Sequence, residues 1–340
     1  MKNIIFRVNI QLDVKKLIYI NYPIPLIGHI AFGIVDRGTN LLQIRPFSNC
    51  PMSCIFCSVD AGPNSRYRVT EFIVNSDHLL DWSYYVISKK IHKVNVLIDG
   101  VGEPILHPEI HKIIKGLKGN PKVNEVAIET HGLTLNKANI NKLVDAGLDR
   151  LNVSIDSLDI NKAKSLTGHK GYDINKILEV LIYAKLQGID VLLTPVWLPG
   201  INDEDIVEIV KTAKDYNFKI GIQKFIKHKY GRGNDIKEVG WKEFYNYLDD
   251  LEKITMVRLK LSPMDFEIFP DIRLGPVFDI GERVIGEVIS EGWMRNEMIV
   301  KAKNRVITLV DANDLDVGME VKVRIIRNKD EIYLARLDWQ

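Results

Sequence analysis

The sequence predicts an α/β protein with six βα units, followed by a small all-β barrel. Short apolar runs alternate with amphipathic helical runs between residues 41 and 253, and no helical run follows residue 275. Helices that join successive short strands are typical of a parallel sheet. Hydrophobic residues make up 46% of the 340-residue chain and charged residues 26%, which favours a packed core over global disorder.

Each expected strand of the first part precedes an expected helix. The strands are expected at residues 41–46, 93–99, 125–130, 150–156, 190–197 and 219–225. The helices are expected at residues 77–91, 108–118, 137–147, 174–188, 203–216 and 241–253. This alternation is compatible with an open barrel and with a doubly wound sheet. In both folds the functional side chains lie at the carboxyl ends of the parallel strands.

The chain divides into three expected segments. Residues 1–37 form a strand-rich arm, residues 38–270 hold the βα units, and residues 275–340 form the small barrel. Five short strands are expected in the barrel, with the sequences RVIGEVIS, EMIVKAKN, RVITLVD, EVKVRIIR and EIYLARL. The stretch Leu274-Gly275-Pro276 is the expected linker.

The overall charge of the chain is close to neutral. The formal net charge is +2, so it neither requires nor excludes a nucleic-acid partner. No apolar run reaches about 18 residues, so no membrane-spanning helix and no membrane partner are expected. The N-terminal stretch MKNIIFRVNIQLDVKK is interrupted by charges and lacks the apolar core of a signal peptide. The expected location is therefore cytoplasmic.

All three cysteines of the chain, Cys50, Cys54 and Cys57, lie in one loop after the first strand of the βα units. An odd and tightly spaced set is a poor basis for disulfides and indicates metal ligation in a reducing compartment. Thiolates bind iron well because both are soft, and three protein ligands leave one iron of a four-iron cubane open. One alternative is a structural zinc site, but this needs a fourth ligand and residues 48–70 contain no histidine. The other alternative is a set of incidental buried cysteines.

The C-x3-C-x2-C spacing, with Phe56 just before the last cysteine, resembles the signature of the radical S-adenosylmethionine (SAM) superfamily. Further motifs similar to those of the superfamily follow in order: Gly102-Glu103-Pro104 (similar to GGE), Thr130-His131-Gly132 (similar to TNG), Ser154-Ile155-Asp156 (similar to SxD) and the turn Leu198–Glu204. Two positions depart from the pattern, because Val101 replaces the first glycine of GGE and His131 replaces the asparagine of TNG. The resemblance covers roughly residues 38–260 and implies a partial (β/α)6 barrel, closest to the molybdenum-cofactor and peptide-modifying branch.

The resemblance also implies a role for each motif residue. Cys50, Cys54 and Cys57 would hold a [4Fe-4S] cluster, and S-adenosyl-L-methionine would chelate its open iron. The implied cofactor-binding residues are Phe56 by the adenine, Gly102 and Glu103 at the methionine amine, Thr130, and Ser154 and Asp156 at the carboxylate or ribose.

The motifs outside the cysteine loop have structural alternatives. Glu103 is then a solvated residue of a strand-to-helix turn, and Thr130 is a simple strand-end residue. Ser154 and Asp156 are then caps of the segment that follows them.

The cysteine count limits the type of radical chemistry. One cluster uses all three cysteines, so no thiolate remains for the auxiliary cluster of sulfur-inserting relatives and of many peptide-modifying relatives. The resemblance implies reductive cleavage of SAM to a 5′-deoxyadenosyl radical, with electrons from a donor such as ferredoxin or flavodoxin. Hydrogen abstraction would then lead to rearrangement, dehydrogenation, coupling or methylation by a second SAM.

The C-terminal barrel gives the first clue to the substrate. It resembles a TRAM or related OB-type module, which on a radical SAM enzyme implies RNA, often transfer RNA (tRNA). Residues 275–340 hold ten Lys and Arg against twelve Asp and Glu, which suits phosphate binding only if the charges segregate. Two candidate basic clusters lie at Arg295–Arg305 and Lys322–Arg327. A structural or protein-docking role is the alternative.

Two loops give further clues. The basic and aromatic stretch Lys224–Asn234 follows the sixth strand and suits a phosphate-bearing substrate, with a solvated loop as the alternative. The polar loop Asp60–Arg68 past the cysteines is a candidate lid or substrate contact, with surface exposure as the alternative. Modification of tRNA is the leading hypothesis. The alternatives are an enzyme of small-molecule cofactor or metabolite biosynthesis and an enzyme of protein or peptide modification.

Overall fold

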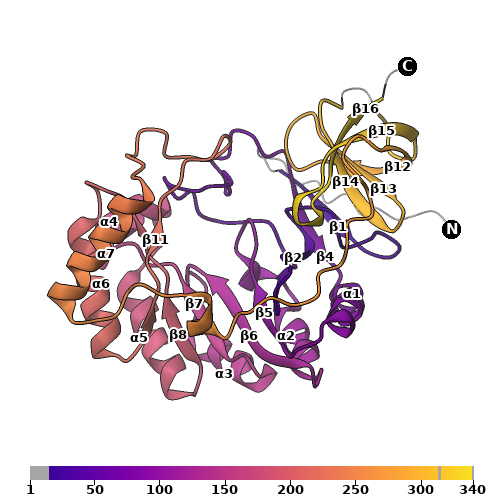
Figure 1. Cartoon of the computed structure of the whole chain (residues 1–340). Coiled ribbons are helices and arrows are strands. Elements are labelled where there is room, and N and C mark those ends of the chain that lie inside the picture. Colours follow the sequence, from indigo (N-terminus) through magenta and orange to yellow (C-terminus); the bar gives the residue numbers. More distant parts are fainter. Residues whose placement is uncertain (1–14, 313–314, 339–340) are drawn as a thin grey trace. The chain divides into compact units, whose positions relative to one another are not determined.

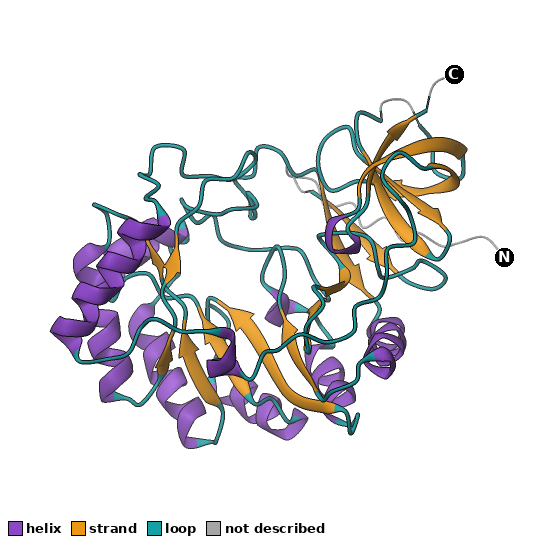
Figure 2. Cartoon of the chain, viewed as in Figure 1, coloured by secondary structure: helices purple, strands orange, loops and turns teal. Residues whose placement is uncertain are grey.

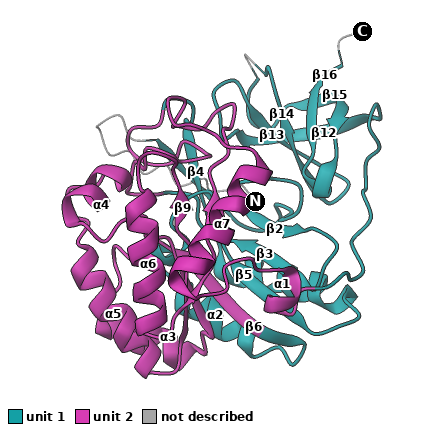
Figure 3. Ribbon diagram, turned by 60° about the vertical axis from the view of Figure 1, so that its left-hand side comes forward, with its two compact units in different colours: residues 1–49, 66–124, 269–340 teal, residues 50–65, 125–268 magenta. Residues whose placement is uncertain are grey.

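The computed structural model of the chain describes residues 15–312 and 315–338, so the expectations for residues 1–14 lie outside the described residues. The chain forms two compact units (Figure 3). Unit 1 comprises residues 1–49, 66–124 and 269–340, and unit 2 comprises residues 50–65 and 125–268. The cysteine loop therefore belongs to unit 2, and the GGE-like turn belongs to unit 1.

Unit 1 contains the first βα elements (Figure 1). Strand β3 (Leu41–Arg45) runs parallel to β5 (Val94–Ile98) and antiparallel to β2 (Gly33–Asp36). Helix α1 (Ser76–Lys89) precedes β5, and α2 (Ile110–Lys118) follows it. The bounds of β3, β5, α1 and α2 lie within two residues of the predicted ones. The structure adds a parallel pair that was not predicted, β1 (Lys16–Ile20) with β4 (Thr70–Val74).

Unit 2 continues the alternation of strand and helix (Figure 2). Its parallel strands are hydrogen-bonded in the order β6 (Val123–Thr130), β7 (Arg150–Val153), β8 (Asp190–Leu193) and β10 (Lys219–Ile220). Its helices are α3 (Lys137–Ala146), α4 (Ile160–Thr167), α5 (Ile174–Leu186), α6 (Asp203–Asp215) and α7 (Trp241–Thr255). Strands β6 and β7 are each followed by a helix, as the sequence predicts, whereas the short strands β9 and β11 come between β8 or β10 and the next helix.

The structure differs from the predicted elements at three places in unit 2. The expected strand 190–197 is divided at Pro195 into β8 and β9 (Val196–Trp197), because proline has no N–H for the ladder. The expected strand 219–225 is divided into β10 and β11 (Gln223–Lys224), and β11 pairs with β9. Helix α4 was not predicted.

The predicted C-terminal barrel is present in unit 1. Its strands are β12 (Arg283–Glu291), β13 (Met298–Ala302), β14 (Arg305–Leu309), β15 (Glu320–Arg327) and β16 (Leu334–Leu337), and they close in the order β12-β13-β14-β16-β15. The run β15-β12-β13-β14 is a Greek key, and β14 and β16 are parallel. A five-stranded Greek-key barrel is the architecture of OB folds. Among the described residues of the barrel, the only helical segment is the short 3-10 turn Lys329–Glu331.

The barrel packs against the arm within unit 1. The Val306 N–H donates to the Ile27 carbonyl at 2.9 Å, and the Tyr333 N–H donates to the Gly28 carbonyl at 3.0 Å. A side chain at Gly28, whose φ is +128°, would place its Cβ 1.9 Å from the Val306 carbonyl oxygen. Described parts of the arm, the first βα elements and the barrel thus lie in the same compact unit.

The architecture confirms the predicted α/β class with a small closed β-barrel at the C-terminal end. Within residues 15–312 and 315–338, no helix combines the length and the apolar character needed to cross a membrane.

Candidate functional site

The cysteine loop lies along the end of α4 in unit 2. The Ser53 and Ile55 amides donate to the carbonyls of Thr167 and Leu166, each at 2.9 Å. Gly168 ends α4 with a left-handed φ of +61°, and a Cβ there would lie 2.6 Å from the Ser53 carbonyl oxygen. The unpredicted helix therefore forms one wall against which the loop is fixed.

Arg232 holds the same loop from the other side. Its guanidinium donates to the Cys54 carbonyl at 2.8 Å and to the Ala61 carbonyl at 2.6 Å, and it pairs with Asp60 at 3.0 Å. Its backbone N–H donates to the Cys57 carbonyl at 2.8 Å. The sequence suggested a phosphate contact for this part of the chain, whereas in the structure Arg232 binds the cysteine loop.

The thiols have polar neighbours that suit a thiolate-bound cluster. The Ala61 N–H donates to Cys57 Sγ at 3.2 Å, and His131 Nε2 lies 3.7 Å from Cys54 Sγ. Hydrogen bonds to cluster sulfurs are one means by which proteins adjust cluster potentials. Cys50 and Cys54 are buried, and Cys57 is partly exposed.

The chain offers three thiols, Cys50, Cys54 and Cys57, as ligands for a metal site. Within the described ranges, no three His, Cys, Asp or Glu side chains lie close enough together to hold one metal ion. A tetrahedral zinc site needs its ligands to converge on one point, whereas the thiolates of a cubane bind different irons. Cys50, Cys54 and Cys57 stay the predicted ligands, and they would hold a [4Fe-4S] cluster through three of its irons.

The TNG-like and SxD-like motifs meet at the carboxyl ends of β6 and β7. The Ser154 N–H donates to the Thr130 carbonyl at 3.0 Å, and Thr130 Oγ1 accepts the Gly132 N–H at 2.9 Å. Asp156 is not the cap of α4, because Asp159 accepts the N–H of Lys162 there at 2.7 Å. The capping alternative for Asp156 is therefore wrong at this helix.

The two carboxylate oxygens of Asp156 have different surroundings. Its Oδ1 accepts the Val196 N–H at 2.8 Å, while Oδ2 is buried and receives no hydrogen bond from the described residues. Asn202, in the predicted glycine-containing turn, donates to the Asp156 carbonyl at 3.1 Å and holds this segment in place. An unpartnered buried carboxylate oxygen is costly, so a donor from a ligand would be favourable here. A ribose hydroxyl or the amine of SAM is such a donor.

Burial raises the pKa of Asp156 to about 6, against the lowering effects of the Val196 N–H, His131 and the nearby Ser154 hydroxyl. The carboxylate is thus ionised above about pH 6 and protonated below it. If the ionised form accepts a hydrogen bond from SAM, SAM affinity falls as the pH drops through this value, by up to about tenfold per pH unit.

We therefore expect SAM to bind several-fold more weakly at pH 5.5 than at pH 7.5, with flattening above pH 6. Equilibrium dialysis of SAM with the reconstituted protein measures this, and Asp156→Asn is the matched control because it keeps the shape and removes the titration. The variant should bind more weakly than wild type at pH 7.5 and show no step near pH 6. An identical pH profile in both proteins would contradict a role for Asp156 in SAM binding.

The GGE-like turn lies after β5 in unit 1. Glu103 is 1% exposed, which excludes the solvated alternative, and its N–H donates to the Asn49 carbonyl at 2.8 Å. A Cβ at Gly102 would lie 2.1 Å from the Ser48 carbonyl oxygen, so this position requires glycine. The turn is therefore fixed against the backbone that leads into the cysteine loop.

Glu103→Ala and Ser154→Ala should each weaken SAM binding while leaving the iron content unchanged. Loss of a hydrogen bond to a charged group corresponds to a decrease of roughly tenfold or more in affinity. Matched controls are Glu109→Ala and Ser165→Ala, because both residues are exposed, Glu109 at the N-cap of α2 and Ser165 within α4. Wild-type SAM affinity in both test variants would assign Glu103 and Ser154 a structural role.

The polar loop after the cysteines differs from the prediction at Arg68. This residue was a candidate substrate contact, but it is 4% exposed and its guanidinium donates to the Val101 carbonyl at 2.7 Å. The polar composition of this loop predicts exposure, and nothing in the sequence indicates that Arg68 is buried.

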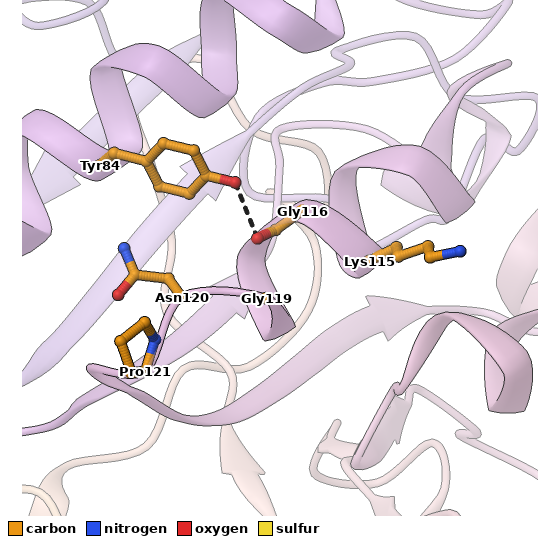
Figure 4. Close-up of a pocket in the computed structure, with 6 residues that line it drawn as sticks. All are labelled: Tyr84, Lys115, Gly116, Gly119, Asn120 and Pro121. Carbon is orange, nitrogen blue, oxygen red and sulfur yellow. Dashed lines mark hydrogen bonds between the residues drawn. The ribbon is translucent and has the colours of Figure 1, made fainter.

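A surface pocket in unit 1 is separate from these motifs (Figure 4). It is lined by Tyr84, Lys115, Gly116, Gly119, Asn120 and Pro121. The Tyr84 hydroxyl donates to the Gly116 carbonyl at 2.8 Å. The turn after α2 precedes the amino end of β6, whereas the GGE-like turn follows the carboxyl end of β5. The lining residues belong to α1, α2 and the turn that follows α2, and none of the six is a residue of the predicted motifs.

Comparison with known proteins identifies the family. A family model described as the Radical SAM superfamily matches residues 44–213. The uncharacterized protein MJ0103 of Methanocaldococcus jannaschii is 36% identical, over 95% of this chain and 81% of its own length. GTP 3′,8-cyclase of Listeria monocytogenes serotype 4b is 28% identical, over 67% of this chain and 65% of its own length.

Solved structures share the fold. SuiB of Streptococcus suis, in a crystal structure with its precursor peptide SuiA, superposes with a TM-score of 0.52. It is 15% identical, and the match covers 69% of this chain and 48% of SuiB. A radical SAM methyltransferase from Sphaerobacter thermophilus gives a TM-score of 0.51 at 12% identity, over 65% of each chain. At these identities the similarity concerns the fold alone.

Proposed function

Because the chain belongs to the radical SAM superfamily, we propose that it abstracts hydrogen from a small molecule in cofactor or metabolite biosynthesis. Members bind a [4Fe-4S] cluster and SAM, and this chain is an enzyme of that type. With both bound, one-electron reduction cleaves SAM and supplies a 5′-deoxyadenosyl radical. The residues of this chain would hold the cluster (Cys50, Cys54, Cys57), fix its loop (Arg232) and bind SAM (Glu103, Asp156).

The main support for a small-molecule substrate is that the barrel packs against the N-terminal arm of its own chain. OB folds bind oligonucleotides on their second and third strands and on the loops between strands one and two and strands four and five. In this barrel the third strand and the last loop contact the arm through Val306 and Tyr333. Asp330 of the last loop pairs with Arg37 at 2.6 Å. At β14 and at the loop before β16, the chain itself therefore contacts parts of the barrel that an OB-type module would offer to RNA.

The basic residues of the barrel also support a non-RNA substrate. Arg305 pairs with Glu331 at 3.0 Å in a buried ion pair, and Lys303 pairs with Glu282 at 2.5 Å. Arg324 pairs with Asp338 at 2.9 Å. In the other expected basic stretch, Lys224 pairs with Glu238 at 3.2 Å. Cations already paired with carboxylates gain little from phosphate contacts, because those pairs must be broken first.

The curated relatives point in the same direction. A GTP 3′,8-cyclase is named for a reaction on a nucleotide, and it aligns over 67% of this chain. The alignment covers 65% of that enzyme, and the rest of it has no counterpart in the alignment. GTP is therefore a compound to test as a substrate, and it is not assigned as the substrate.

The proposal is tested by substrate-dependent release of 5′-deoxyadenosine, measured by mass spectrometry under anaerobic conditions. We expect a low-molecular-mass cell extract to stimulate release above the uncoupled background, and bulk tRNA to give no stimulation. Transfer of deuterium from a labelled compound into 5′-deoxyadenosine would then identify the substrate. The Cys54→Ala variant should be inactive with every pool. Stimulation by tRNA but not by small molecules would overturn the proposal.

Modification of tRNA remains the second candidate, carried by the OB-type topology of the barrel. It predicts tRNA binding whose log affinity falls steeply with log salt, and loss of that binding when Lys227 and Lys229 are neutralised. We propose in either case that a ferredoxin or flavodoxin supplies the electron. Reduction of the cluster by such a protein in place of dithionite tests that part.

A further inference from the structure

We propose that the C-terminal barrel positions the SAM-binding turn of its own chain, through Trp293 and Arg68. The inference concerns the loop Gly292–Glu297 between β12 and β13, which corresponds to the first ligand-binding loop of an OB-type barrel. It goes beyond the proposed function, because it assigns a task to the barrel whatever the substrate is.

Arg68 joins the two backbone segments that lead into the cofactor site. Its guanidinium donates to the Val101 carbonyl at 2.7 Å, directly before the GGE-like turn. It also donates to the Ser48 carbonyl at 2.6 Å, two residues before the first cysteine. The Glu71 carboxylate forms an ion pair with the same guanidinium and accepts the Ser48 hydroxyl at 2.6 Å. One buried cation thus fixes the distance between these two segments.

The barrel completes the surroundings of this cation. The guanidinium carbon of Arg68 lies 4.6 Å from the ring centroid of Trp293, which is 5% exposed. A cation over an aromatic face is stabilised most when both are removed from water. Its side-chain exposure of 0% shows that Arg68 meets this condition.

The backbone of the loop is held against residues 67–70 by three hydrogen bonds. The Val69 N–H donates to the Trp293 carbonyl at 3.0 Å, and the Thr70 hydroxyl donates to the Gly292 carbonyl at 2.6 Å. The Arg295 N–H donates to the Tyr67 carbonyl at 3.2 Å. The loop that binds ligands in other OB-type barrels therefore binds residues 67–70 of its own chain here. These hydrogen bonds hold Trp293 over Arg68.

Trp293 acts as a positioning residue in this arrangement. Removal of the Trp293 side chain would admit water to the Arg68 guanidinium. Water would weaken the hydrogen bonds of Arg68 to the Val101 and Ser48 carbonyls, and the turn that carries Glu103 would become less rigid. The expected result is weaker SAM binding at unchanged iron content, because the cysteines themselves are untouched.

The test compares three full-length, anaerobically reconstituted variants. Trp293→Ala should bind SAM roughly tenfold more weakly, and Trp293→Phe, which keeps a ring over the cation, should restore most of the affinity. Phe278→Ala is the matched control: Phe278 is a buried aromatic residue of the barrel core that packs on Tyr333. It should lower the melting temperature without changing SAM affinity.

SAM affinity is measured by equilibrium dialysis, and the change in the electron paramagnetic resonance spectrum on adding SAM gives a second readout. Wild-type SAM affinity in Trp293→Ala, or an equal loss in Phe278→Ala, would overturn the proposal. If Trp293→Ala does not fold, Thr70→Val decides, since it removes only the hydrogen bond to Gly292 and should weaken SAM binding by a smaller factor. The inference rests on the proposed binding of SAM by Glu103, but these measurements use no substrate, so their outcome is independent of the proposed substrate class.

Discussion

Replacing Cys54 by alanine is expected to abolish reductive cleavage of SAM. The cubane loses one of its three protein thiolates, and no other cysteine in the chain can replace it. Wild type should take up about four irons per chain on anaerobic reconstitution, whereas the variant should retain little iron and release no 5′-deoxyadenosine. Cys50→Ala and Cys57→Ala should behave in the same way.

Ser58→Ala, one residue beyond the last cysteine and exposed, is the matched control and should keep its iron. Iron determination and mass spectrometry of 5′-deoxyadenosine provide the two measurements. Stoichiometric zinc in protein purified without air, together with no uptake of iron, would rule out the cluster assignment.

Replacing Arg232 by methionine is expected to have the second-largest effect, on retention of the cluster. The variant leaves the buried Asp60 carboxylate without its cation and the carbonyls of Cys54 and Ala61 without donors. Removing one partner of a buried ion pair destabilises the folded loop by about 3 kcal/mol. The population of molecules in which the loop is open should then rise on the order of a hundredfold. The rate of iron loss to a chelator should rise accordingly.

Two further variants separate charge from geometry at this position. Arg232→Lys keeps the charge but cannot donate to two carbonyls and a carboxylate in one plane, so it should recover only part of the stability. Lys227→Met is the control, because Lys227 lies in the same basic stretch and its ammonium contacts the Asn234 carbonyl instead. Iron release at the wild-type rate in Arg232→Met would show that the loop does not depend on this residue.

The locations of most strands and helices could be predicted from the sequence, because they follow from the local pattern of apolar residues. Strand β3 and helix α2 were located because each buries one regular set of apolar side chains. Helix α4 was missed because it is short, with eight residues and only Ala163, Leu166 and Thr167 buried. The break of the fifth expected strand follows from Pro195, which has no N–H to donate to a neighbouring strand.

In the candidate site, the motif residues could be predicted from the sequence, but the burial of the arginines around them could not. The spacing of the cysteines and the order of the motifs after successive strands are local features, and they predict which residues would hold the cluster and SAM. Whether Arg68 and Arg232 face solvent or the protein depends on which distant segments pack against them. Sequence spacing carries no information on that burial.

The alternation of strand and helix and the small barrel could be predicted from the amino-acid sequence, because hydrophobic periodicity is a property of short segments. The spacing of the cysteines is local in the same way and predicts the ligands of the cluster. The roles of two arginines became clear only from the folded structure. Arg68 and Arg232 are each bound by carbonyls and carboxylates from several segments, and these meet only after folding. The folded structure also decided that the barrel docks on the arm of its own chain, since this depends on the close approach of Gly28 to Val306 across more than 270 residues of sequence.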